Sequence, residues 1–104
     1  MQRVGFTMKL HDGCAAEYRR RHDAIWPELK AVLKEAGITN YSIFLDPDTN
    51  VLFAYLKIPE RESLRRLSDH PVMHKWWNFM RDIMDTNEDA SPVVKDLDEV
   101  FFLE

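Results

Sequence analysis

The order of strand-like and helix-like segments, the apolar character of a central hairpin and a length of 104 residues together predict an α+β fold. The segments follow one another as strand, helix, strand, strand, helix, strand, and each helical segment is interrupted once. This is the β-α-β-β-α-β order of the ferredoxin-like topology, here with split helices. We expect one domain over residues 1–104, because a chain of this length has room for a single core.

The first strand and the first pair of helices are expected before residue 38. Apolar residues at positions 4, 6, 8 and 10 alternate with others, which is the period of a strand. A helix is expected from Cys14 to about Asp23, and Trp26-Pro27 interrupts it. Pro27 suits the first turn of a second helix, which Gly37 ends.

A hairpin is expected from the strands Tyr41 to Leu45 and Val51 to Ile58, joined by the turn-forming residues Asp46 to Asn50. Both strands carry apolar side chains on even and odd positions, so both faces of the hairpin are largely apolar. Helices can cover one face only, and the other must meet a second sheet or enclose a ligand. A face-to-face homodimer satisfies this requirement, and we expect two copies to form a dimeric α/β barrel.

The C-terminal half supplies the second split helix and a final strand. A short helix is expected over Glu60 to Ser68, and Pro71 begins another whose apolar residues keep helical spacing as far as Met84. The last strand is expected around Glu99 to Leu103.

Charge and composition exclude several classes of partner. A formal net charge of −4 argues against nucleic acid, and the basic triplet at 19–21 is interpreted as mostly a solvated helix face. Cys14 is the only cysteine, so we expect a reducing, cytoplasmic setting. Polar residues near the N-terminus argue against a signal peptide, and no run of about 18 apolar residues exists to cross a membrane, so no membrane partner is expected.

Tyr18 and His22 lie four residues apart on the first predicted helix and therefore project from the same face. A histidine with a pKa near about 6.5 donates and accepts protons at neutral pH, and a nearby phenol can bind a hydroxyl. The plainer alternative is that His22 only stabilises the helix end, where a cation is favoured.

Trp76-Trp77 lies on the fourth predicted helix, where adjacent side chains point about 100° apart. Either this helix is widely buried or one indole ring lines a cavity, in which case it could stack on the C–H face of a ligand ring. Tyr41, near the start of a strand, has the same two alternatives of core and cavity.

No cofactor or metal site is predicted. His70 and His74 have the i, i+4 spacing of a metal pair, but no third ligand is evident and the glutamate of an HExxH motif is absent. The glycines are isolated from one another, so no phosphate or dinucleotide cradle is indicated.

Several motifs remain that spacing alone does not interpret. Tyr18 to Leu29 has the sequence YRRRHDAIWPEL, and Asn40 to Asp46 has NYSIFLD. Trp76-Trp77, Ser91-Pro92-Val93 and Glu99-Val100-Phe101 follow further along the chain. Together they resemble L-rhamnose mutarotases, whose signatures include Y-x-R-R-H-x-x-I-W-P-E-L, N-Y-x-I-x-L-D, a tryptophan pair, an S-P-V turn and a closing strand. The resemblance covers essentially the whole chain.

The resemblance implies a function and a set of site residues. His22 matches the family's proton donor, and no metal or organic cofactor is implied. The positions that contact the sugar are matched by Tyr18, Tyr41, Trp76 and Trp77. The implied activity is L-rhamnose mutarotase, which exchanges the α and β pyranose anomers by acid/base-catalysed ring opening.

Two other functions stay open on the sequence alone. One is a cofactor-free oxygenase of the antibiotic-biosynthesis type, which shares this kind of fold and also uses Trp and His pockets. The other is a non-enzymatic sugar-binding or regulatory dimer, because a fold does not fix a function.

Overall fold

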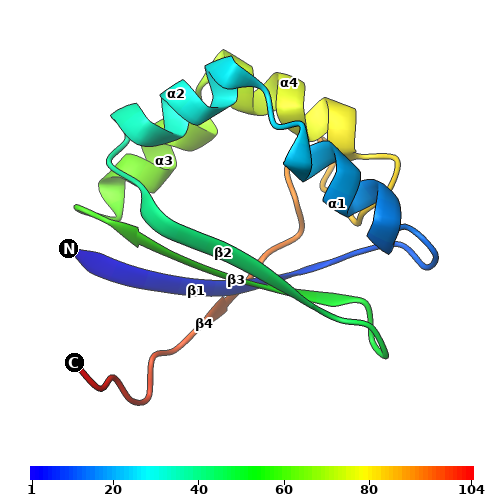
Figure 1. The fold of residues 1–104 in the computed structure, drawn as a ribbon. Coiled ribbons are helices and arrows are strands. Elements are labelled where there is room, and N and C mark those ends of the chain that lie inside the picture. Colours follow the sequence, from blue (N-terminus) through cyan, green and yellow to red (C-terminus); the bar gives the residue numbers. More distant parts are fainter.

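The computed structural model describes residues 1–104 as a four-stranded antiparallel sheet with four helices on one face (Figure 1). The strand order is β2-β3-β1-β4, as in ferredoxin-like folds. The sheet is open, so one chain by itself does not form the barrel expected from the sequence. The strands are β1 (Gln2–Lys9), β2 (Thr39–Asp46), β3 (Val51–Ile58) and β4 (Lys95–Leu97). The helices are α1 (Ala15–Asp23), α2 (Pro27–Glu35), α3 (Glu62–Ser68) and α4 (Pro71–Met80).

Both helical segments are split as predicted, and proline begins the second helix of each pair. Pro27 and Pro71 occupy the first turns of α2 and α4, where a missing N–H costs no hydrogen bond. Gly37 follows α2 with φ +85°, and a Cβ at this position would lie 2.6 Å from a ring carbon of Pro59. Glycine is therefore required there both for its backbone angle and for the close approach of the chain. None of the helices is long and apolar enough to cross a membrane.

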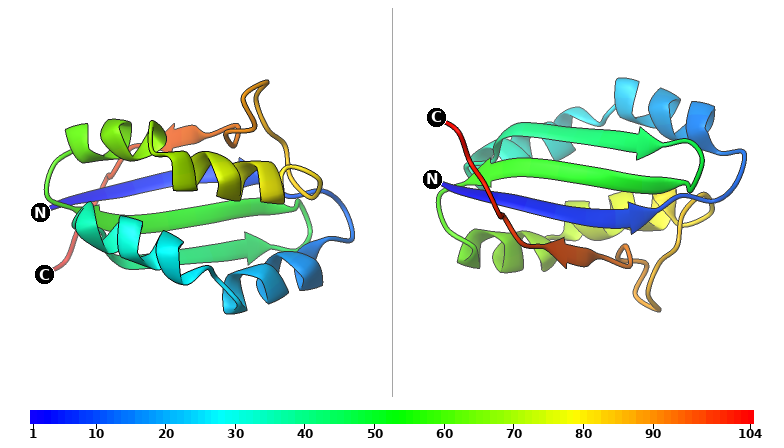
Figure 2. Two further views of the ribbon diagram at one scale, coloured as in Figure 1. Left: turned by 90° about the horizontal axis from the view of Figure 1, so that it is seen from above. Right: turned by 90° about the horizontal axis from the view of Figure 1, so that it is seen from below.

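The register of the hairpin assigns its side chains to faces. Ile43 pairs with Ala54, and Ala54 is buried beneath the helices, whereas Phe44 pairs with Phe53 on the opposite face. Directly paired residues share a face, so both faces of the sheet are apolar, as predicted. The helix-free face is seen from below in Figure 2, where the C-terminal segment crosses the strands.

The predicted closing strand is wrong. Strand β4 is Lys95–Leu97, paired with β1 over Gly5 to Thr7, and residues 98–104 form no strand. Arg3 instead holds this terminal segment. Its guanidinium makes two hydrogen bonds to the Glu99 carboxylate, at 2.7 and 2.9 Å, and lies 3.5 Å from the centre of the Phe102 ring.

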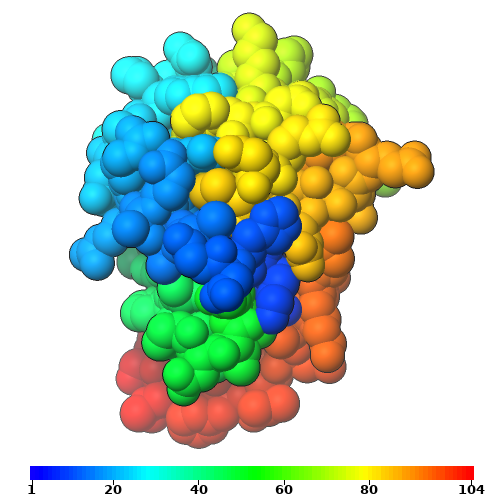
Figure 3. Space-filling model, turned by 90° about the vertical axis from the view of Figure 1, so that its right-hand side faces the viewer, coloured from blue at the N-terminus to red at the C-terminus, as the bar shows by residue number.

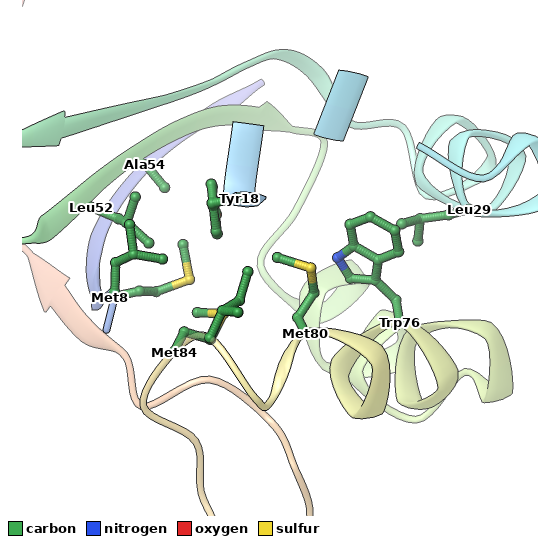
Figure 4. Packing of buried hydrophobic residues seen from close by; sticks show 10 residues of the cluster. Met8, Tyr18, Leu29, Leu52, Ala54, Trp76, Met80 and Met84 are labelled. Carbon is green, nitrogen blue, oxygen red and sulfur yellow. The ribbon is translucent and has the colours of Figure 1, made fainter. Parts of the chain in front are cut away.

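The core fills the space between the helices and the sheet. The larger of two buried clusters joins β1 and β3 to α1, α2 and α4, and Figure 4 shows Tyr18 beside the strand residues while Trp76 lies near Leu29. Helix α4 ends at Met80, earlier than predicted, yet Met84 is still buried because the chain turns back beside Leu10. The helical spacing of the apolar residue Met84 therefore indicated that this side chain is buried, not that the helix continues to it.

Candidate active site

One cavity of about 1120 Å³ between the helices and the sheet is lined by all five residues that the sequence singled out. They come from three elements that are distant in sequence. The residues are Tyr18 and His22 on α1, Tyr41 on β2, and Trp76 and Trp77 on α4. The volume is slightly above the range of about 300–1,000 Å³ that is usual for small-molecule pockets, so the cavity has room for a whole sugar ring.

His22 is held tightly by its neighbour one turn earlier. Its Nδ1 lies 2.9 Å from the Tyr18 carbonyl oxygen, and since a carbonyl only accepts, Nδ1 carries the hydrogen. The imidazole stacks on the Tyr18 ring at 4.3 Å and meets the Trp76 ring edge-on at 5.4 Å. Burial lowers the pKa of His22 below its usual value, while the Tyr18 carbonyl and the Asp23 charge oppose this shift.

Three polar atoms of this cluster have no partner within the chain and are not fully buried. The Tyr18 hydroxyl, His22 Nε2 and the Trp76 indole nitrogen make no hydrogen bond within the chain. No buried side-chain nitrogen or oxygen lacks a hydrogen-bond partner, so these three atoms keep some accessible surface. They are thus free to bind the hydroxyls of a ligand.

Tyr41 lines the cavity from a β-bulge near the start of β2. Thr39 pairs with Lys57 and Ser42 with Tyr55, so two residues of β2, Asn40 and Tyr41, lie opposite one residue of β3. Asn40 has φ +53°, a left-handed conformation that asparagine tolerates better than most residues. Tyr41 keeps 40% of its surface exposed, yet its phenol is desolvated enough to raise its pKa to about 12.

The two tyrosines are proton donors rather than bases at neutral pH. Burial raises the pKa of Tyr18 above its usual value of 10, and the nearby Tyr41 adds to this shift. Both phenols therefore keep their protons, and each can donate a hydrogen bond to a sugar oxygen.

Packing fixes the orientation of Trp76. Its ring meets Trp26 edge-on at 5.1 Å and lies 5.6 Å from the ring of Phe79. Trp76 is almost fully buried, whereas Trp77 is half-buried and meets His74 edge-on at 5.1 Å. The tryptophan pair is thus partly core and partly cavity wall, which combines the two alternatives that the sequence left open.

His70 and His74 do not form a metal pair in this structure. The Nδ1 of His70 accepts a hydrogen bond from the Val72 N–H at 3.1 Å and caps the start of α4. No group of three or more His, Cys, Asp or Glu side chains is placed to hold a metal ion.

Arg21 was not predicted as a site residue, because the basic triplet at 19–21 was interpreted as mostly a solvated helix face. The Arg21 side chain is only 10% exposed and binds Glu17 and Asp82. Glu17, four residues earlier on the same helix, was the only local signal for this burial. Asp82 and the Phe79 carbonyl, which Arg21 also contacts, are 61 and 58 residues away.

The chain is similar over nearly its whole length to one family of known proteins. The family model for L-rhamnose mutarotase matches residues 3–103. An L-rhamnose mutarotase of Agrobacterium fabrum is 52% identical over 103 residues, covering 99% of this chain and 96% of that protein. The crystal structure of an L-rhamnose mutarotase from Formosa agariphila superposes with a TM-score of 0.93 at 46% identity, covering both chains in full.

The fold alone is shared more widely. An antibiotic biosynthesis monooxygenase has a TM-score of 0.52 at 12% identity, covering 96% of this chain and 99% of that one. This likeness is confined to the fold, whereas the family match extends over the motifs that carry the five cavity residues. The chain belongs to the L-rhamnose mutarotase family.

Proposed function

We propose that this protein is an L-rhamnose mutarotase, an isomerase that interconverts the α and β pyranose anomers, and that one domain over residues 1–104 carries this activity. The observation that carries the proposal is that His22, whose Nε2 makes no hydrogen bond within the chain, lines a cavity together with two tyrosines and two tryptophans in a member of this family.

His22 is the proton donor in this proposal. Because Nδ1 stays bonded to the Tyr18 carbonyl, only Nε2 gains or loses a proton. Nε2–H protonates the ring oxygen as the anomeric hydroxyl loses its proton, and the bond between the anomeric carbon and the ring oxygen breaks to give the free aldehyde. Rotation about the adjacent carbon–carbon bond and reclosure on the other face give the second anomer. On reclosure the former ring hydroxyl returns its proton to Nε2, and the aldehyde oxygen regains a proton from the group that took the anomeric one, which restores the anomeric hydroxyl.

The surroundings of Tyr18 and Tyr41 bear on which group accepts the proton of the anomeric hydroxyl. A phenol with a raised pKa is almost never ionised at neutral pH, and only its ionised form could accept this proton. Tyr18 and Tyr41 are therefore better suited to binding hydroxyls than to removing the anomeric proton. An acidic side chain or a water molecule is left for this step. Asp23 and Asp96 are the carboxylates that line the cavity, and Asp23 directly follows His22.

The tryptophans supply the apolar side of the sugar site. Sugar rings present a C–H face that packs against aromatic rings, and an oriented indole also donates a hydrogen bond from its nitrogen. Trp76, held by Trp26 and Phe79, provides a fixed wall for this contact, and Trp77 lines the same cavity.

The active form in this proposal is a homodimer that packs through the helix-free face of the sheet. Phe44, Phe53 and Leu97 on this side are 68%, 43% and 39% exposed. The terminal segment adds Val100, 93% exposed, and Phe101, 77% exposed (Figures 1 and 3). Apolar surface of this extent is characteristic of an interface, and two sheets packed face to face would make the dimeric α/β barrel.

The proposed setting is the cytoplasm, with a small sugar as the only ligand besides the second copy. A lone half-buried cysteine is consistent with a reducing compartment. A net charge of −4 disfavours a nucleic-acid partner.

Saturation-transfer NMR on the anomeric protons of L-rhamnose tests the proposed activity directly. Catalytic amounts of protein should speed transfer of saturation between the two anomeric signals. An oxygenase would instead consume oxygen with an aromatic substrate, and a regulatory protein would bind the sugar without speeding exchange. Either result would replace the proposal.

A further inference from the structure

We propose that Arg21 is a positioning residue, which locks α1 against the end of α4 and thereby sets the placement of His22 relative to Trp76. The proposal rests on the proposed function, because it concerns the same site. Arg21 does not line the cavity itself.

All three nitrogens of the Arg21 guanidinium donate hydrogen bonds. Nε donates to Glu17 at 2.7 Å on its own helix. On the other side, Nη1 donates to the Phe79 carbonyl at 2.7 Å, and Nη1 and Nη2 both donate to the Asp82 carboxylate, at 2.9 and 3.1 Å. A lysine has one nitrogen on a flexible chain and cannot make this set of contacts together.

A series of aromatic contacts connects Arg21 to His22, the proposed proton donor. The Arg21 guanidinium lies 4.6 Å from the centre of the Phe79 ring, and that ring packs against Trp76 at 5.6 Å. Trp76 in turn meets His22, the residue next to Arg21, at 5.4 Å. Arg21, Phe79, Trp76 and His22 therefore form a closed circuit across two helices. Figure 3 shows these parts of α1 and α4 lying against each other.

Arg21 acts on His22 through position rather than charge. Burial is the main cause of the lowered pKa of His22, and the Tyr18 carbonyl and the Asp23 charge oppose it. Arg20 and Arg21 hold the pKa of Glu17 at about 2, so the carboxylate within α1 stays ionised at any pH at which the enzyme would be assayed. The ion pair between Arg21 and Glu17 is thus constant across the pH range in which His22 titrates.

Arg20 provides a matched control. It precedes Arg21 and donates to the same Glu17 carboxylate, but its side chain is 66% exposed and makes no hydrogen bond or ion pair with α4. Arg20→Met therefore removes two hydrogen bonds to Glu17 while the bonds from Arg21 to Phe79 and Asp82 remain. Surface changes of this kind leave a fold nearly unchanged.

The test compares Arg21→Met, Arg21→Lys and Arg20→Met in anomer exchange and in NMR of the His22 ring protons, at a temperature where all are folded. Arg21→Met should lower kcat by about 10- to 100-fold, the effect of a small misplacement of reacting groups, with a smaller change in KM. The pH midpoint of His22 should stay constant, while its ring-current shift from Trp76 should change. Arg21→Lys should recover only part of kcat, and Arg20→Met should behave as wild type.

Asp82→Asn keeps the test decisive if Arg21→Met does not fold, since Asp82 is exposed and its change leaves the contacts of Arg21 with Glu17 and Phe79 in place. It should shift the His22 ring signals in the same direction and lower kcat less. Unchanged ring signals and unchanged kcat in folded Arg21→Met, or in Asp82→Asn, would overturn the proposal. Failure of the proposed function would give a different result. The wild-type protein would then not catalyse anomer exchange, while the NMR signals of the His22 ring could still change on substitution of Arg21.

Discussion

The imidazole of His22 stacks on the ring of Tyr18 at 4.3 Å and donates from Nδ1 to the Tyr18 carbonyl at 2.9 Å. One residue thus supplies both the packing surface and the hydrogen bond that orient the histidine. Because both contacts come from within α1, the orientation of Nε2 follows directly from the helix. The spacing of four residues predicted that the two side chains share a helix face, whereas the role of His22 was implied only by the family resemblance.

The lowered pKa of His22 predicts a pH dependence of the exchange rate. If the protonated Nε2 is the donor to the ring oxygen, kcat/KM should rise as pH falls from 8 toward the His22 pKa, which lies below about 6.5. Below that pKa the rate should level off. An NMR titration of the His22 ring protons should give the same midpoint. A rate that falls on acidification through this midpoint would mean that neutral His22 starts the reaction as a base.

The pKa of His22 also links pH to stability. Its folded-state pKa is depressed, so the unfolded chain binds a proton more readily. The contribution of His22 to the free energy of unfolding should be lost as pH falls through the unfolded value of about 6.5 toward the folded one. Urea unfolding at several pH values should show less of this loss in His22→Gln. An equal loss in both proteins would show that His22 does not titrate differently on unfolding.

Phe53→Glu tests the proposed dimer. This change places a charge on the helix-free face of the central strand β3, and burying an unpaired carboxylate in an interface is costly. Sedimentation at micromolar concentration should show a dimer for wild type and a monomer, or a strongly weakened dimer, for the variant. Lys30→Glu on the exposed side of α2 is the control and should remain dimeric. A wild-type monomer with full activity would contradict the dimeric barrel.

Exchange activity should survive dialysis against EDTA. His70 is engaged as the cap of α4, and no third ligand lies near His70 and His74. His70→Ala should therefore lower stability by about 0.5–2 kcal/mol through loss of the cap, whereas His70→Asn should retain most of it. Both variants should keep exchange activity when folded. Loss of activity on chelation that zinc restores would place a metal in the reaction.

Local patterns predicted most of the fold because their physical causes are local. Pro27, Pro71 and Gly37 mark helix boundaries through fixed backbone preferences, and the turn residues at 46–50 fix the hairpin. The last strand was misplaced because its pairing is not local. Apolar residues at 100–103 resemble a strand, yet β1 pairs with the more polar Lys95–Leu97.

The residues of the candidate site that belong to local motifs could be predicted from the sequence. The residue whose contacts are distant in the sequence could not. His22, Tyr18 and the tryptophans were identified by spacing and by family motifs, and all line one cavity. Arg21 was missed because its burial depends on Asp82 and on the Phe79 carbonyl, which only the folded chain brings to α1. Their proximity cannot be read from the basic triplet alone.

The exchange rate of His22→Ala relative to Tyr18→Phe, measured by saturation transfer on L-rhamnose with folded proteins, tests the central claim most directly. Loss of a general acid should slow exchange by at least about 10²-fold, whereas loss of one hydroxyl hydrogen bond typically costs about 0.5–1.5 kcal/mol. His22→Ala should therefore be by far the more damaging change. A near wild-type rate in His22→Ala together with an inactive Tyr18→Phe would contradict the account and assign the proton transfer to the tyrosine.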